Sequence, residues 1–442
     1  MEQTLAGSYR PRDPQTSDYH RCTQDHFERL EMVWDDRYER RYGFWRPYVM
    51  DVIRRYLECG DPHFGFARVK CTECQHEYLL PFSCKRRHFC PSCRQKRVVE
   101  FGAWLCEEVL KAVPHRQWVF SIPKILRKFF MTDRRLLCKL SRCAWKVLSL
   151  CLTETAGCDD ARAGAAVAVH TFGDFQNFNP HLHIIVTDGC FYGNGKFLVC
   201  TPPDHKLVEE MFRHEVFKML KSEGKIGDML IDNLMNWRHS GFNVYCGNPL
   251  WPGDQKGLEN LSRYIIRASF SQQRMTYIPG IDWSGSQAQV IYRSKDGSTC
   301  KTYDALDWLA QLTCHIPNRG EQMVRYYGYY SNKCRGQRKK AGGDEIVPSI
   351  TESTASFASR KSWAQLIQKI YEVDPLTCPK CQGRMRVIAF IEDDAVIRKI
   401  LVHLGLWDIR NHDPPSPALE SFQDVIIDES YSQLPQNEPW MM

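Results

Sequence analysis

Residues 177–189 read N-F-N-P-H-L-H-I-I-V-T-D-G and place two histidines directly before an apolar run. Side chains at positions i and i+2 of a strand point to the same face of a sheet. We therefore expect His181 and His183 to stand side by side, while Leu182 and Ile184 face the opposite layer. Two neutral imidazoles on a rigid strand are a suitable platform for a divalent ion. A His-x-His pair alone is more often part of an ordinary polar face, so the rest of the chain must decide.

The segments around this stretch predict an α+β fold. Residues 167–172 (V-A-V-H-T-F) have the pattern of a partner strand, residues 117–122 (Q-W-V-F-S-I) that of a buried strand, and residues 195–200 that of a third strand. Long helical patterns separate and follow them, at residues 126–152 and 202–237. This order favours an antiparallel sheet with helices packed on one face.

Length and composition are those of an ordinary globular protein. The chain has 442 residues, of which 43% are hydrophobic and 25% charged, and this is enough for two or three domains. Its net charge of +7 permits a polyanionic partner, and basic residues crowd into 85–97 and 325–340. We expect a soluble intracellular protein, because no basic leader precedes an apolar core and no apolar run approaches the ~20 residues of a membrane span.

Two cysteine pairs give the strongest local signal. Twenty cysteines in a long chain without a leader favour reduced thiols and metal ligands over disulfides. C-T-E-C at 71–74 and C-P-S-C at 90–93 have the spacing of a structural zinc site with four thiolates. The ligand set stays open between the pairs and two residues that lie between them. The candidates are Cys71, Cys74, Cys90 and Cys93, with Cys84 and His88 as alternatives.

A third pair, Cys378 and Cys381 in C-P-K-C, is half of a zinc knuckle near the end of the chain. No second cysteine pair follows within reach, so we expect this half either to be completed by another residue, such as His403, or to stay empty. A segment rich in Gly, Ser, Thr and Pro precedes it, which is typical of a linker.

Basic and aromatic residues are interleaved in two places. One group surrounds the predicted zinc site, and the other lies in 315–340, where tyrosines alternate with cations. Such a pattern stacks on bases and neutralises phosphates, which suits single-stranded nucleic acid. The predicted DNA-binding residues are Lys85, Arg86, Arg87, Arg94, Arg97, Arg263, Arg325, Tyr327, Arg335 and Arg338.

Four blocks of the chain together resemble a known family. They are F-S-C-K-R-R-H-F-C-P-S-C-R-Q-K-R at 82–97, N-P-H-L-H-I-I-V-T-D-G at 179–189, L-S-R-Y-I-I-R-A-S-F-S at 261–271 and H-I-P-N-R-G-E-Q-M-V-R-Y-Y-G-Y-Y-S-N-K-C-R-G at 315–336. In this order they resemble the rolling-circle transposases of the insertion sequence common region (ISCR) type, which have an N-terminal zinc-binding domain. These belong to the HUH superfamily of single-strand DNA endonucleases. The resemblance runs from about residue 71 to residue 381.

The resemblance implies a mechanism and its residues. His181 and His183 would hold Mg²⁺ or Mn²⁺, with Gln176 as the third ligand and Asn179 or His170 as alternatives. Tyr264 would attack the scissile phosphate and form a 5′-phosphotyrosine link, so that rejoining needs no ATP. A phenol needs activation, which the metal or Arg267 would supply.

Two departures bear on this mechanism. Some relatives carry two tyrosines one helical turn apart, whereas position 260, four residues before Tyr264, is Asn260. The chain also has no G-x-x-x-x-G-K-[ST] stretch, so host helicases or replication would have to separate the strands. Two other functions stay open: a replication initiator with the same chemistry, and a zinc-ribbon DNA-binding regulator without catalysis.

The residue patterns and the resemblance together predict an arrangement of domains. We expect a helical region at 1–60, a zinc-binding domain at 61–98, an HUH palm at 99–340, a linker at 341–361, a zinc-knuckle-like region at 362–410 and a flexible tail at 411–442. The palm would be an antiparallel sheet that carries the histidines, with the tyrosine helix packed beside it. Structural Zn²⁺, catalytic Mg²⁺ or Mn²⁺, single-stranded DNA at element ends and target site, and a cytoplasmic, nucleoid-associated location of bacterial type complete the expectation.

Overall fold

The computed structural model describes residues 14–86, 88–193, 196–280, 287–342 and 376–407. Within them the protein is a mixed α+β structure whose paired strands are all antiparallel, as the sequence predicts. The predicted tail at 411–442 and most of the predicted linker at 341–361 lie outside the described residues. No described helix is both long enough and apolar enough to cross a membrane.

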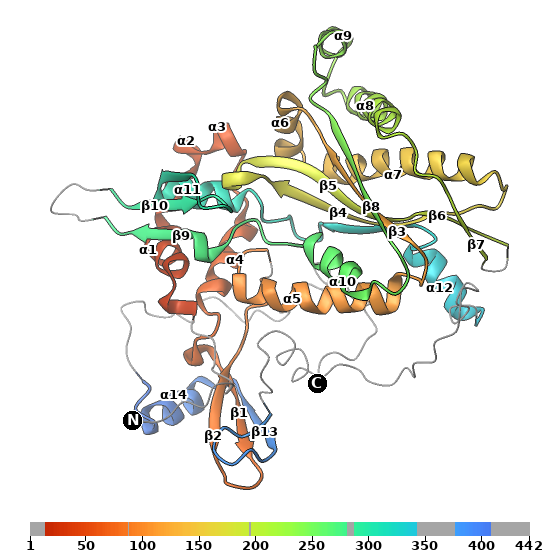
Figure 1. Cartoon of the computed structure of the whole chain (residues 1–442). Helices are drawn as coiled ribbons and strands as arrows, with labels where there is room; N and C mark the ends of the chain where they lie inside the picture. Colours follow the sequence, from red (N-terminus) through yellow and green to blue (C-terminus); the bar gives the residue numbers. More distant parts are fainter. Residues whose placement is uncertain (1–13, 87, 194–195, 281–286, 343–375, 408–442) are drawn as a thin grey trace.

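A five-stranded antiparallel sheet forms the centre of the molecule (Figure 1). Its strand order is β12-β4-β5-β3-β8. The strands are β3 (His115–Ser121), β4 (Gly164–Phe172), β5 (Phe178–Thr187), β8 (Asn243–Leu250) and β12 (Val324–Gly328). Every residue of β4 is buried, and so are the last eight of β5, because both faces of the sheet are covered.

Helices cover both faces of this sheet, which corrects the expectation of a single covered face (Figure 1). One face packs on α6 (Lys124–Thr132), α7 (Arg135–Ala156), α8 (His205–Ser222) and α9 (Asp228–Met235). The other packs on α5 (Pro91–Trp104), the π-helical turn Leu105–Val109 that follows it, and α10 (Gln255–Tyr264).

The predicted third strand at 195–200 does not join the central sheet. Strand β7 (Lys196–Val199) pairs with β6 (Gly189–Tyr192) in a separate two-stranded ribbon. The places beside β4, β5 and β3 are filled by β12 and β8, which come from later in the chain. After β12, the chain continues into α12 (Asn332–Lys340).

The N-terminal helices pack against a part of the chain that is distant in sequence. Helices α1 (Asp18–Met32), α2 (Trp34–Arg37), α3 (Glu39–Tyr42) and α4 (Pro47–Leu57) share one core with β9 (Met275–Ile278), β10 (Gln289–Arg293), β11 (Cys300–Asp304) and α11 (Ala305–Thr313). Tyr19, Tyr56 and Trp308 are among its fully buried members. The predicted domain boundaries stay predictions, but residues 14–57 do not have a core of their own.

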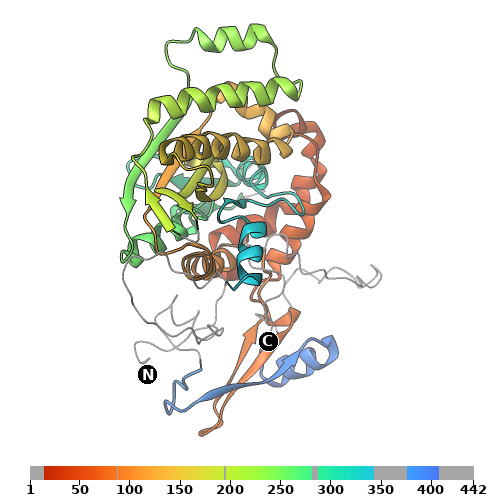
Figure 2. The same ribbon diagram turned by 90° about the vertical axis from the view of Figure 1, so that its right-hand side faces the viewer.

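Another three-stranded sheet pairs strands from distant parts of the chain. Its order is β13-β1-β2, with β1 (Phe66–Cys71), β2 (Glu77–Pro81) and β13 (Met385–Ile391). Figure 2 shows β13, in blue, lying along the orange hairpin of β1 and β2, with α14 (Asp394–His403) beside them. Short 3-10 turns complete the structure at Pro14–Thr16, Pro62–Phe64, Asp174–Gln176 and Gln272–Arg274.

Candidate active site

Three histidines meet on the face of the central sheet that α5 and α10 cover. His181 and His183 alternate with Leu182 along β5, as the i and i+2 pattern predicts. In the neighbouring strand β4, His170 is the direct cross-strand partner of His181, and Ala168 is that of His183. The register of β4 and β5 therefore adds a third imidazole to the predicted pair.

The imidazole rings are close enough to share one ion. Ring centroids lie 4.5 Å apart for His170 and His183, 5.0 Å for His181 and His183, and 5.1 Å for His170 and His181. Each ring offers one nitrogen, either Nδ1 or Nε2, and these three nitrogens lie within 4.8 Å of one another. Neutral imidazole nitrogens in this arrangement are typical ligands of divalent transition metals.

Hydrogen bonds occupy one nitrogen of each ring. His170 donates from Nε2 to the main-chain oxygen of Ile265 (2.6 Å), and His181 donates from Nδ1 to the main-chain oxygen of Asn179 (2.8 Å). These bonds leave Nδ1 of His170 and Nε2 of His181 with a free lone pair. Nδ1 of His170 and Nε2 of His183 are buried and have no hydrogen-bond partner among the described residues. Buried polar atoms without a partner are rare; Nδ1 of His170 fits a bound cation as it stands, and Nε2 of His183 fits one when the ring proton is on Nδ1.

Gln117 determines which nitrogen of the His183 ring carries the proton. Its Nε2 lies 3.2 Å from Nδ1 of His183 and donates to it, so a neutral His183 carries its proton on Nε2. If the amide turns by 180°, its Oε1 accepts from Nδ1–H instead, and Nε2 of His183 becomes a ligand. Sequence reasoning missed Gln117, because a polar residue in a buried strand gives no sign of which side chain it faces.

Burial keeps the three imidazoles neutral. It is the first cause that lowers the pKa of His181 to about 4 and that of His183 to about 3. Burial also lowers the pKa of His170 well below its usual value, and the neighbouring His183 and His181 lower it further. Neutral imidazoles keep the lone pairs that a metal ion needs at neutral pH.

Tyr264 lies at the edge of this group. It is the last residue of α10, and its ring stands perpendicular to that of His183 with the centroids 5.3 Å apart. Its side chain is 40% exposed, so the histidine group and the tyrosine meet where solvent can reach. The guanidinium carbon of Arg267 lies 4.5 Å from the centroid of the Tyr264 ring.

Arg267 lies after the end of α10, and the sequence did not predict where this helix ends. The tyrosine helix that the resemblance implies is α10, and it ends at Tyr264 itself. The chain then turns, and the main-chain oxygen of Ile265 is free to accept the hydrogen bond from His170. The end of the helix therefore fixes the tyrosine and the histidine group relative to each other.

Gln176, the predicted third ligand, lies in the turn between β4 and β5. Its backbone has a φ of 60°, and its main-chain oxygen accepts a hydrogen bond from Nε2 of His315 (2.8 Å). Both polar atoms of its amide are buried without a partner among the described residues. His170, which sequence reasoning named only as an alternative, is the residue that the structure groups with His181 and His183.

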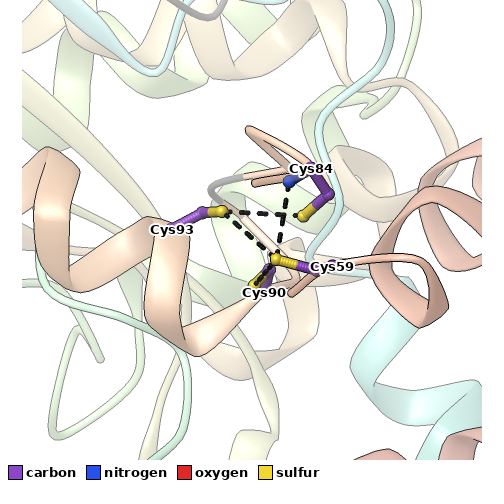
Figure 3. A group of neighbouring side chains, drawn as sticks. All are labelled: Cys59, Cys84, Cys90 and Cys93. Atoms are coloured by element: carbon purple, nitrogen blue, oxygen red, sulfur yellow. Dashed lines mark hydrogen bonds between the residues drawn. The ribbon is translucent and has the colours of Figure 1, made fainter. Parts of the chain in front are cut away.

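A cluster of four cysteines lies at the start of α5 (Figure 3). It consists of Cys59, Cys84, Cys90 and Cys93. The sulfur atoms are separated by 3.8 Å for Cys59 and Cys93, 3.7 Å for Cys59 and Cys90, and 3.6 Å for Cys84 and Cys93. Cys90 caps α5 and Cys93 lies in its first turn. These separations match the edges of a zinc tetrahedron with Zn–S bonds of about 2.3 Å.

This cluster corrects the predicted zinc site. Cys90 and Cys93 are grouped as expected, but Cys71 and Cys74 belong to a different group, with Cys378 and Cys381. Their places are taken by Cys84, which was an alternative, and by Cys59, which was not considered. Cys59 lies outside any C-x-x-C pair, so its spacing carries no signal. His88 lies outside both groups, and its Nδ1 accepts from Arg94 (3.2 Å).

Several predicted DNA-binding residues around the cysteines have structural contacts. Arg94 donates to the main-chain oxygen of Arg267 (2.6 Å), which connects α5 to the segment after Tyr264. Arg97 is only 3% exposed, with its guanidinium over Phe101, so it supports the core rather than facing solvent. The other members of this set are Arg86, paired with Asp51 (2.8 Å), Arg263, paired with Glu259 (2.9 Å), exposed Lys85, and Arg87, which lies outside the described residues.

The basic and aromatic residues after α11 are also packed together. Arg338 lies over Tyr329 (3.8 Å), and Arg335 lies over Tyr326 (5.2 Å). Tyr327 shares a hydrogen bond with Ser141 (2.7 Å), and Arg325 is half-buried on β12. These contacts lie within the protein and do not test DNA binding, so that role stays a prediction for these residues.

Comparisons with known proteins give two matching families. A model described as "Transposase zinc-binding domain" matches residues 30–122, which contain the whole cluster Cys59, Cys84, Cys90 and Cys93. A model described as "Putative transposase" matches residues 164–338, which contain the three histidines and Tyr264.

Two relatives cover most of the chain. The transposase for insertion sequence element IS801 of Pseudomonas savastanoi pv. phaseolicola is 24% identical over 372 residues, which are 79% of this chain and 85% of that protein. The "Putative transposase y4qJ" of Sinorhizobium fredii (strain NBRC 101917 / NGR234) is 23% identical over 397 residues, 78% of this chain and 96% of that protein. No solved structure matches.

Proposed function

Because two transposase family models match this chain and its relatives are transposases, we propose that it is a transposase of the IS91 type that nicks and rejoins single-stranded DNA through a 5′-phosphotyrosine intermediate on Tyr264. The observation that carries the proposal is the contact between Tyr264 and the histidine group, with ring centroids 5.3 Å apart. In this proposal the five-stranded sheet is an HUH palm, and α5 and α10 cover its catalytic face.

His170, His181 and His183 would hold Mg²⁺ or Mn²⁺. The fit rests on their neutral rings and on the buried nitrogens that have no partner among the described residues. When bound, such an ion polarises the scissile phosphate and stabilises negative charge on its oxygens. His170 takes the place that the sequence gave to Gln176, because it belongs to the group and Gln176 is placed by its bond to His315.

Tyr264 supplies the nucleophile. Its phenolic oxygen forms a bond to the phosphorus as the bond from phosphorus to the 3′ oxygen breaks, and the released strand ends in a 3′-OH. The phenolic proton passes to solvent, which reaches the 40% exposed side chain. Rejoining is the reverse reaction, in which a 3′-OH displaces the tyrosine, so no ATP is required.

Arg267 is placed to assist both the Tyr264 nucleophile and the phosphate of the substrate in this step. Its guanidinium lies 4.5 Å from the centre of the Tyr264 ring, where it favours negative charge developing on the phenol oxygen. Its positive charge also attracts the phosphate backbone of the substrate. Arg94 holds the main-chain oxygen of Arg267, so the helix that begins at the cysteine cluster supports this position.

A single tyrosine at this place implies sequential use or a second subunit. One helical turn before Tyr264 lies Asn260, which is exposed and cannot form a phosphotyrosine. We propose that Tyr264 acts in both cleavage and transfer, at element ends and at the target site. Host helicases or replication would supply the single strands.

The test uses the full chain, Mn²⁺ and single-stranded oligonucleotides that carry the element ends. We expect a covalent adduct on denaturing gels, with the modified peptide containing Tyr264. Tyr264→Phe removes the adduct, while Tyr192→Phe, on the remote β6–β7 ribbon, retains it. Adding a second oligonucleotide with a free 3′-OH should transfer the held strand. A regulator without catalysis would form no adduct with any substrate, and that result would overturn the proposal.

A further inference from the structure

Two C-x-x-C pairs that are distant in sequence meet beside the sheet of β13, β1 and β2. Cys71 is the last residue of β1 and Cys74 follows it, whereas Cys378 and Cys381 precede β13. The sulfurs of Cys71 and Cys381 are 3.6 Å apart, those of Cys74 and Cys378 are 3.4 Å apart, and all four lie within 4.8 Å of one another. Four sulfurs around one zinc ion, with bonds of about 2.3 Å, stand about 3.8 Å apart. A disulfide would require about 2.05 Å.

The two pairs also have the same local structure. The amide of Cys71 donates to the main-chain oxygen of His76 (2.7 Å), and that of Cys378 donates to the main-chain oxygen of Gly383 (2.8 Å). In each case the acceptor is five residues further on. The residue after the second cysteine has a positive φ in both turns, 63° at Gln75 and 62° at Gln382. Non-glycine residues rarely adopt this conformation, so its repetition at matching positions indicates two copies of one turn.

The amides of the first turn point at a ligand sulfur. The backbone N–H groups of Glu73 and Cys74 lie 3.4 Å and 3.5 Å from Sγ of Cys71. Hydrogen bonds of this kind stabilise a thiolate rather than a thiol. The turn therefore favours the protonation state in which cysteine binds a metal.

Strand pairing holds the two turns together. Strand β13 runs antiparallel to β1 from Phe66–Ile391 to Cys71–Met385. Thr72 donates from its amide and its hydroxyl to the main-chain oxygen of Arg384, both at 2.9 Å. Two small cores lie beneath: one has Val69, Cys71, Cys378 and Met385 as its buried members, and the other has Phe66, Ile397 and Leu401. Cores of this size supply little burial energy, and small modules of this kind usually need a metal ion.

We propose that Cys71, Cys74, Cys378 and Cys381 bind a second structural Zn²⁺, which fastens residues 376–407 to the hairpin of β1 and β2. The ligand set is closed, with four protein sulfurs and no place for substrate, so the ion stabilises rather than catalyses. This cluster is distinct from Cys59, Cys84, Cys90 and Cys93, and half of its ligands lie outside both matched families. In this proposal Cys71 and Cys74, rather than His403, complete the C-terminal knuckle.

Zinc bound by these cysteines would keep β13 paired with β1, so that β1 is not an edge strand. Without residues 376–407, β1 would lose its neighbour on one side and expose a row of unpaired backbone groups. The zinc would thus link two segments of one chain whose ligands are about 300 residues apart in sequence. The inference does not depend on the proposed nuclease chemistry, because no residue of this cluster belongs to the histidine and tyrosine site.

Metal analysis of the purified full chain gives the first test. We expect two zinc ions per chain in the wild type, one in the double variant Cys378→Ser/Cys381→Ser, and two in Cys300→Ser, which changes an exposed cysteine outside both clusters. One zinc in the wild type, iron in place of zinc, or two zinc ions in the double variant would overturn the proposal.

Wild-type protein gives a second test that does not depend on the folding of a variant. Cys74, Cys381 and Cys300 are all exposed, so free thiols at these positions should react with iodoacetamide alike. Bound zinc should slow alkylation of Cys74 and Cys381 at least about 10-fold relative to Cys300, and a chelator should abolish the difference. Equal alkylation of the three cysteines before chelation would overturn the proposal.

Cleavage of the chain tests what the zinc does. A protease site inserted into 343–375 of the full chain allows the C-terminal part to be separated after folding. We expect the cut piece to co-purify with the rest of the chain and to dissociate when zinc is removed. Dissociation while both zinc ions are present would show that the ion does not fasten this segment. Adduct formation by Tyr264, measured in parallel, reports on the proposed nuclease separately.

Discussion

Strands β4 and β5 present an apolar face to α7 and α8, and a face with three histidines to α5 and α10. Neighbouring residues of one strand belong to the two faces, as Leu182 and His183 show. Burial does not distinguish them, because Leu182 is 0% exposed and His183 is 3% exposed. The difference lies in the hydrogen bonds, since a leucine needs none, whereas His170 and His183 each have a buried nitrogen with no hydrogen-bond partner among the described residues. A buried polar group of this kind costs stability, which indicates a functional site.

The largest expected effect is the loss of chemistry on the histidine face. His183→Ala should reduce adduct formation with Mn²⁺ by roughly 100-fold or more, because it removes a metal ligand beside the nucleophile. Circular dichroism should show that the fold persists, since His183 accepts one hydrogen bond from Gln117 and its other ring nitrogen has no partner among the described residues. Adduct formation at the wild-type rate would show that the two faces do not differ in function.

The adjacent residue on the apolar face should behave in the opposite way. Leu182→Ala is expected to lower the free energy of unfolding by about 2–5 kcal/mol, because it opens a cavity in a fully packed core. Adduct formation per folded molecule should stay unchanged, and Leu182→Met, which keeps the volume, should cost less than about 1.5 kcal/mol. Urea unfolding gives the measurement. A selective loss of chemistry in Leu182→Ala would contradict the separation of the faces.

Variants of Gln117 test metal binding on the histidine face separately from packing on the apolar face. Gln117→Leu removes the partner of Nδ1 of His183 and should weaken Mn²⁺ binding about 10–100-fold. Gln117→Glu offers a carboxylate acceptor to Nδ1–H and should restore most of the affinity. Calorimetric titration of Mn²⁺ measures both variants without DNA. Equal affinity in Gln117→Leu and wild type would exclude this positioning role.

The smallest expected effect is a pH dependence that comes from the far end of the histidine face. His115 on β3 is buried and bonded to the hydroxyl of Tyr330 (2.7 Å), and burial lowers its pKa to about 4. The unfolded chain, with a histidine pKa near 6.5, binds the proton first, so stability falls as pH decreases from about 6.5 to 4. His115 should contribute at most about 1.4 kcal/mol per pH unit in this window. Urea midpoints at pH 7.5 and 5.5 should differ less in His115→Gln, and an unchanged difference would exclude His115 as a source.

Strand periodicity gave a correct account of part of the site. The alternation of residues 181–186 placed His181 and His183 on one face and Leu182 and Ile184 on the other, and the antiparallel α+β class was confirmed. The end of α10 at Tyr264 was not predictable, because the apolar pattern continues past it through Ile265 and Ile266. These two side chains are buried on the histidine face after the helix has ended.

The cysteines show where reasoning from spacing stops. C-x-x-C spacing identifies a pair that can share an ion, but it carries no information on which second pair completes the site. Proximity in sequence favoured Cys71 and Cys74 as partners of Cys90 and Cys93, whereas the fold brings the first pair to Cys378 and Cys381. Cys59 and Cys84 complete the other cluster although neither lies in a C-x-x-C pair.

The sequence by itself determined which residues share a face and which pairs have metal-binding spacing, because both follow from the geometry of a few neighbouring residues. Only the tertiary structure decided that His170 joins His181 and His183, that Gln117 faces His183, and which cysteines meet. These contacts depend on the pairing register of strands distant in sequence and on the packing of residues 376–407 against β1 and β2. Local periodicity does not encode either of them.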